Sequence, residues 1–194
     1  QKAKYSAFPS LLLKEWMGSY FPNFLKTGVI IPHQNAKYEI KNNEFPSYFD
    51  VSKFNIVHAG NLMAQRSPEG LIEGFKLFLN QNPEARKETQ LLLLGNATDH
   101  KQMLDEYQKS NPEIYIYNGS IAFDSVFLLQ KEASVNVILE AKSEISPFLP
   151  AKFPHCVAAN QVILSLAPYY SENRRLLGKD YPYWSEQDDV KKIA

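Results

Sequence analysis

The sequence is poor in cysteine and has no excess of either charge. Its 194 residues contain one cysteine, Cys156, so no disulfide can form within the chain. This favours a reducing compartment, and we expect a cytoplasmic or membrane-peripheral location. Lysine and arginine total 21, as do aspartate and glutamate. Because a neutral chain has no overall field to attract nucleic acid, any anion must be bound by a local group of cations.

Long apolar runs are also missing. The longest, such as Leu91 to Leu94 and Val135 to Leu139, are far shorter than the roughly 20 residues that a transmembrane helix needs. We therefore expect no transmembrane segment in this chain. The sequence begins at Gln1 without an apolar leader and stops at Ala194 within a polar pattern. We interpret it as a fragment of a longer protein, incomplete at its C-terminus.

Several catalytic motifs are absent. There is no Gly-x-x-x-x-Gly-Lys-Ser/Thr, no Gly-x-Gly-x-x-Gly and no Gly-x-Ser-x-Gly, which argues against a P-loop, a dinucleotide-binding dehydrogenase and an α/β-hydrolase. One cysteine and four scattered histidines do not make a zinc site. The acidic residues near predicted strand ends, Asp99, Asp124 and Glu140, form no recognisable metal cluster, so we expect no metal.

From residue 54 onward, short β-rich runs alternate with helical patterns. The predicted strands cover 54–59, 91–94, 114–118, 135–140 and 161–166, and the predicted helices cover 67–80, 98–109, 122–132, 151–159 and 171–177. Strands separated by roughly ten to fifteen helical residues predict βαβ units. The fold class is therefore α/β, with a doubly wound, mostly parallel sheet.

Residues 1–53 do not share this alternation. They contain an amphipathic helix from Pro9 to Tyr20, a short strand from Gly28 to Ile31, and a polar, irregular run from 34 to 50. We interpret 1–53 as the tail of a preceding domain and a connector, and 54–194 as the Rossmann-like domain.

Ligands of such sheets bind at the carboxyl ends of the strands, where three predicted strands end at Gly60, Gly95 and Gly119. Glycine permits tight turns and close approach of the backbone to a ligand. Arg66 lies just before a helix start predicted at Ser67 and Pro68, and a cation beside a helix N-terminus makes a phosphate clamp. The alternative for Arg66 is a solvated loop side chain.

A second cation lies in the loop that follows the strand at 135–140. Pro150 and Ala151 open the predicted helix, and Lys152 occupies its first turn against the helix dipole. Such a position indicates a functional constraint, or else an exposed lysine tolerated at a cost of about 0.3–1 kcal/mol. His155, one turn further on, could bind a ligand hydroxyl or cap backbone. His58 interrupts a buried strand and is interpreted as a core histidine.

Four segments are similar, in their order and spacing, to one known family. They are 58–75 with Gly60 and Arg66, 91–95 with Gly95, 117–120 with Gly119, and 147–163 with Pro150, Ala151 and Lys152. Together they resemble the C-terminal, donor-binding domain of family 4-type glycosyltransferases with the two-domain GT-B architecture.

The resemblance implies hexosyl transfer from a nucleoside diphosphate sugar to an acceptor, as in polysaccharide biosynthesis. It implies that Arg66 and Lys152 bind donor phosphate and that the turn at Gly119 approaches the base. The cations would stabilise the leaving diphosphate, so no cofactor or metal is expected. Most catalytic side chains would come from a missing N-terminal domain of the same polypeptide, so this chain should be inactive alone and its catalytic residues are unknown.

Three positions depart from the family. Pro147 and His155 stand where many members carry two glutamates that contact the donor sugar and ribose, and Asn160 replaces a glycine before the last strand. Asn160 also tolerates left-handed backbone. The departures leave a second interpretation open, namely a catalytically degenerate GT-B-like binding module.

Overall fold

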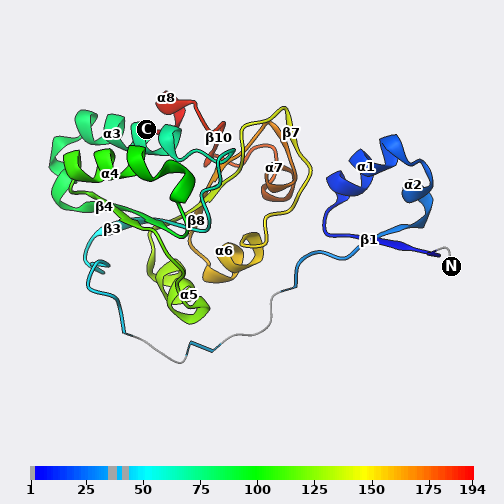
Figure 1. The fold of residues 1–194 in the computed structure, drawn as a ribbon, viewed down its shortest axis with the longest axis horizontal. Coiled ribbons are helices and arrows are strands. Elements are labelled where there is room, and N and C mark those ends of the chain that lie inside the picture. Colours follow the sequence, from blue (N-terminus) through cyan, green and yellow to red (C-terminus); the bar gives the residue numbers. More distant parts are fainter. Residues whose placement is uncertain (1–2, 35–38, 41–43) are drawn as a thin grey trace.

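The main part of the protein is a six-stranded parallel sheet (Figure 1). The structure, a computed structural model, describes residues 3–34, 39–40 and 44–194. From one edge to the other the strands are β5 (Ile114–Tyr117), β4 (Thr89–Leu94), β3 (Phe54–Ala59), β6 (Val135–Leu139), β8 (Val162–Leu166) and β10 (Trp184–Ser185). Every neighbouring pair is parallel.

The order of the strands places a topological switch point between β3 and β6. The chain runs outward from β3 through β4 to β5, returns to β6 beside β3, and then runs the other way through β8 to β10. This is the strand order of the Rossmann fold, in which ligands bind where the order reverses. The predicted doubly wound, parallel α/β fold is confirmed.

Helices cover both faces of the sheet (Figure 1). The helices α3 (Glu69–Gln81) and α4 (Lys101–Ser110) pack on one face, where Leu91 and Leu93 are buried. The helix α5 (Phe123–Glu132) packs on the other face against Leu92 and Leu94, and α6 (Phe153–Ala159) lies beside it over β6 and β8. The continuously apolar β4 is thus buried on both sides, as parallel strands in α/β proteins are.

Two predicted helix starts are wrong by a few residues. Ser67 does not cap α3: Pro68 holds the cap position, the helix begins at Glu69, and the Ser67 hydroxyl accepts the Glu69 amide at 3.3 Å in a turn. The helix predicted over 98–109 opens as a 3-10 turn, η2 (Thr98–His100), before α4 begins. Terminal turns are the part of a helix that sequence patterns define least.

The start of α6 is also later than predicted. Pro150 does not open the helix but accepts the Phe153 amide in the preceding turn at 2.9 Å, and Lys152 holds the cap position. A different proline, Pro154, fills the first turn, where its missing N–H costs nothing. The helix ends at Asn160, whose backbone is left-handed (φ 58°). This conformation is expected for an asparagine at a position where the resembled family carries glycine.

The N-terminal segment forms a small βαβ unit with its own sheet. The strands β1 (Ser6–Phe8) and β2 (Gly28–Ile30) pair in parallel, and α1 (Leu11–Tyr20) and α2 (Asn23–Thr27) connect them. The unit is tied to the rest by Glu172, whose carboxylate accepts the first two amides of α1 at 3.2 and 3.3 Å. The prediction of a helix and a strand here is confirmed, whereas β1 and α2 were not predicted.

The remaining elements are short. They are η1 (Pro83–Lys87), β7 (Ile145–Ser146), β9 (Tyr170–Ser171), α7 (Glu172–Leu177) and α8 (Val190–Ile193), and β7 pairs with β9. The connector rejoins the main sheet at Phe49, which is buried against Val57 and Leu92. Among the helices of the described residues, none has the length and apolarity to cross a bilayer.

Candidate functional site

The three predicted loop glycines meet in one pocket at the carboxyl ends of β3, β4 and β5. The pocket has a volume of about 190 Å³. Its lining residues are Ala59, Gly60, Asn61, Leu94, Gly95, Gly119, Ser120, Ile121 and Val126. The prediction that these three glycines lie together is confirmed, because parallel strands bring their C-terminal loops to the same end of the sheet.

Glycine is required at two of these turns. Gly60 and Gly95 have φ values of +155° and +140°, and a Cβ on Gly95 would lie 2.5 Å from the Gly60 carbonyl oxygen. Asparagine side chains then link the loops: the Asn61 side-chain oxygen accepts the Asn96 amide at 3.2 Å, and that of Asn118 accepts the Ala97 amide at 2.9 Å. The asparagines were not predicted, although their positions directly after strand ends suit such bridges.

Lys152 reaches across the switch point to His58. His58 lies on β3 and is completely buried. Its Nδ1 lies 3.2 Å from the Val137 carbonyl oxygen on β6, and its Nε2 lies 3.4 Å from Lys152 Nζ. A carbonyl only accepts, so Nδ1 carries the proton and Nε2 accepts a hydrogen bond from the lysine. The interpretation of His58 as a buried histidine with satisfied partners holds, but one partner is a candidate site residue.

Burial sets the charge states of this pair. It lowers the pKa of His58 well below the ordinary value, and the nearby Lys152 and Arg66 lower it further, so the imidazole is neutral. Burial also lowers the pKa of Lys152 to about 7; the thiol of Cys156 acts in the opposite direction and the charge of Arg66 in the same one. Part of Lys152 reaches solvent, but its amine lies against Gly60, where a Cβ would be 2.3 Å from Nζ.

Arg66 adds a second positive charge to the same place. Its Nη1 donates to the Asn61 carbonyl oxygen at 3.3 Å. Its positive charge lowers the pKa values of His58, Lys152 and Glu140. Its Nε is buried and has no hydrogen-bond partner within the described residues. A buried donor left unpaired costs free energy. Arg66 thus lies near enough to Lys152 for its charge to lower the pKa of the lysine.

Glu140 is the buried acid of this region. It follows β6 at the switch point and is 4% exposed. Its carboxyl accepts from Asn173 at 2.7 Å and hydrogen-bonds Ser146. Burial raises the pKa of Glu140 to about 7, although Ser146, Arg66 and Asn173 each act to lower it. The sequence marked Glu140 only as an acid near a strand end, because Asn173 and Ser146 are distant in sequence.

The other predicted site residues lie around this pair. Pro150 and Ala151 form the turn that leads into Lys152. His155 packs edge-on against Phe123 at 4.9 Å between ring centroids and also contacts Phe127, both on α5. Its Nδ1 is buried and has no hydrogen-bond partner among the residues that the structure describes, and burial lowers the pKa of His155. His155 is therefore placed at the contact between α5 and α6.

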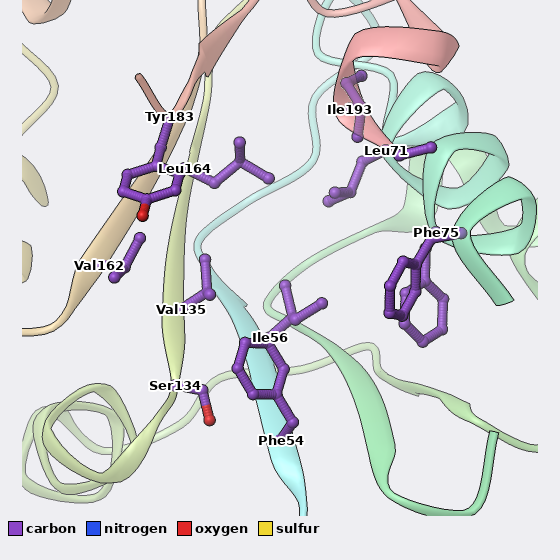
Figure 2. A pocket seen from close by; sticks show the side chains of 12 residues that line it. Phe54, Ile56, Leu71, Phe75, Ser134, Val135, Val162, Leu164, Tyr183 and Ile193 are labelled. Carbon is purple, nitrogen blue, oxygen red and sulfur yellow. The ribbon is translucent and has the colours of Figure 1, made fainter. Parts of the chain in front are cut away.

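A larger cavity lies at the opposite end of the strands, where they begin. It has a volume of about 450 Å³ and sits where β3, β6 and β8 begin (Figure 2). Its lining is almost entirely apolar, with Phe54, Ile56 and Phe75 among the side chains that face it. Of the residues described, no charged side chain lines it, so these side chains do not offset the charge of a phosphate. In the described part of the chain, no three His, Cys, Asp or Glu residues are grouped to hold a metal.

Comparisons with known proteins agree with the fold. No protein-family description matches the sequence, and no curated protein matches it. Among solved structures, the chain is similar to a glycosyltransferase from Rickettsia africae ESF-5 (TM-score 0.69, 11% identity, 98% of this chain and 51% of that one). It is also similar to the N-terminal domain of a trehalose-6-phosphate phosphatase from Candida albicans (0.64, 15%, 98% and 49%).

A third similar structure is a UDP-forming α,α-trehalose-phosphate synthase from Burkholderia xenovorans in complex with glucose-6-phosphate (TM-score 0.56, 9% identity, 74% of this chain and 34% of that one). The chain spans between a third and a half of the length of these structures. At such low identity the similarity establishes the fold: a Rossmann-like domain of the kind found in GT-B glycosyltransferases.

Proposed function

We propose that this chain is the donor-binding domain of a family 4-type glycosyltransferase. It holds the diphosphate of a nucleotide sugar between Arg66 and Lys152. The observation that carries the proposal is the placement of these two cations at the β3–β6 switch point, beside the glycine-lined pocket. The similarity to a UDP-forming synthase supports UDP as the first nucleotide to test.

The chemistry follows from the charges. In glycosyl transfer the bond between the anomeric carbon and the β-phosphate oxygen breaks, and the negative charge of the diphosphate increases. The Lys152 ammonium and the Arg66 guanidinium stabilise that charge in a site partly shielded from water, where electrostatic interactions are strong. The acceptor binds across the cleft on an N-terminal domain of the same polypeptide, of which the β1–β2 unit is the last part.

Calorimetric titration with UDP and GDP tests the proposal. We expect binding of one of them by the chain. Replacement of Arg66 or Lys152 by alanine should weaken it about tenfold or more, since each removes a charge-assisted hydrogen bond of about 1.5–3 kcal/mol. Lys142→Ala is the matched control, because Lys142 lies in the same loop but pairs with Asp188. A folded chain that binds no nucleoside diphosphate contradicts the proposal.

A second candidate is a binding module without transferase activity. The Pro147 carbonyl accepts a hydrogen bond from Ser10 at 2.6 Å, and His155 packs on aromatic rings. Both positions thus serve structural contacts and supply no carboxylate to the donor. The protein joined to its N-terminal domain, assayed for loss of sugar from radiolabelled UDP-glucose and other nucleotide sugars, separates the two: turnover supports the enzyme, and tight binding without turnover supports the module.

A further inference from the structure

We propose that His58 is a positioning residue that holds the Lys152 ammonium in place for the diphosphate; this inference rests on the proposed function of the site. The imidazole and the amine come from elements 94 residues apart in sequence, β3 and the turn before α6. Their contact spans the switch point, where the donor is proposed to bind.

The tautomer of His58 is fixed by its own strand neighbour. The Val137 carbonyl oxygen on β6 accepts from Nδ1, and in this tautomer the lone pair of Nε2 is directed at Lys152, while a second backbone contact, with Gly60, also raises the pKa of His58. The ring is fully buried, so neither solvent nor a rotated ring can substitute for this arrangement. A neutral imidazole with one donor and one acceptor is suited to hold an ammonium without adding a second positive charge.

The surroundings explain why Lys152 needs such a partner. Two neighbouring groups shift the pKa of the amine: Arg66, from the loop after β3, lowers it, and Cys156, on α6, raises it. Glu140, at the end of β6, interacts electrostatically with Arg66 and accepts hydrogen bonds from Asn173 and Ser146. In the part of the chain that the structure describes, Lys152 forms no ion pair. The His58 lone pair therefore favours the charged form of the lysine, which burial and Arg66 oppose.

Gly60 leaves the space for this contact. A Cβ at residue 60 would lie 2.3 Å from Lys152 Nζ and 2.9 Å from Cε. The absence of a side chain allows the amine to pass over the backbone of the pocket rim and reach Nε2. The lysine is thus held against the glycine turn at which the diphosphate is proposed to lie, and two of the three N–H donors of its ammonium remain for the phosphate after one is given to His58.

The experiment compares His58→Met, which removes the acceptor at similar volume, with His58→Gln, whose side-chain oxygen can replace Nε2. UDP affinity is measured by calorimetry from about pH 5.5 to 9, with Lys152→Ala titrated in parallel so that the ionisation of UDP itself (its terminal phosphate at the low end and its uracil at the high end) is subtracted. Wild type should lose affinity as Lys152 deprotonates. His58→Met should bind UDP about tenfold more weakly at pH 7.5 and lose affinity at a lower pH, whereas His58→Gln should remain close to wild type. Equal weakening by both variants without a shift of the pH midpoint would overturn the proposal.

A second measurement needs neither UDP nor a variant of His58. Nitrogen-15 shifts of His58 in the wild-type chain should show a protonated Nδ1 and an unprotonated Nε2 that moves as Lys152 titrates. The opposite tautomer, or an Nε2 signal unaffected by Lys152→Met, would overturn the inference. Wild-type chain that shows the expected tautomer but binds no nucleoside diphosphate would instead refute the proposed function.

Discussion

Substitution of Gly60 by alanine separates backbone strain from displacement of Lys152. Residue 60 has a φ of +155°, where a side chain costs about 1–3 kcal/mol. The new Cβ would also meet Lys152 Nζ at 2.3 Å. Because that atom ends a flexible side chain, it can move at little cost to folding. We therefore expect a loss of stability set by strain alone, together with a displaced lysine.

Gly178→Ala is the matched control. Residue 178 has a φ of +100°, and a Cβ there meets nothing within 4 Å. Urea titrations should show losses of about 1–3 kcal/mol in the free energy of unfolding for both variants. UDP titrations should show about tenfold weaker binding for Gly60→Ala and unchanged binding for Gly178→Ala.

A double-mutant cycle decides whether the binding loss passes through the lysine. In a Lys152→Ala background the steric conflict is gone, so Gly60→Ala should weaken UDP binding by much less than it does in wild type. An equal loss of affinity in both backgrounds would refute the reasoning, because the alanine would then act on the nucleotide itself.

Three further variants test the fold and its charges. Glu140 has a pKa raised to about 7 from 4.5, so its carboxyl should lower the stability of the fold as pH rises through that window. In urea titrations the stability of wild type relative to Glu140→Gln should therefore fall over the window, and a difference that is independent of pH would contradict the buried acid. Glu172→Ala removes the acceptor of two α1 amides and the ion pair with Arg175. Limited proteolysis should then cut the N-terminal unit faster. An unchanged rate would contradict the conclusion that Glu172 holds this unit to the main domain. Leu129→Ala, at a fully buried position on α5, should cost about 2–5 kcal/mol in urea titrations, and a loss below 1 kcal/mol would contradict the close packing.

The fold was predictable because its signals are local. The continuous apolar run at Leu91 to Leu94 and the helical spacing after Pro68 are each encoded within a few residues. The start of α6 was predicted wrongly because two prolines could each occupy its first turn. Pro150 and Pro154 both suit a first helical turn, and the burial of Phe153, which the sequence does not state, accompanies the later start.

The site was predictable only in part. Strand ends marked by Gly60, Gly95 and Gly119 lie together because parallel topology requires it. The pairing of Lys152 with His58 was not predictable, because it joins positions 94 residues apart and depends on the tautomer that Val137 imposes. The available signal is a polar residue, His58, within an apolar strand, and this signal equally suits a core histidine with no role in a site.

The central claim is that a nucleoside diphosphate binds at the β3–β6 switch point between Arg66 and Lys152. A crystal structure of the chain with UDP tests it most directly. We expect the diphosphate within hydrogen-bond distance of Lys152 Nζ and of the Arg66 guanidinium, beside the turn at Gly60. A diphosphate bound elsewhere, with Lys152 still directed only at His58, would contradict the account.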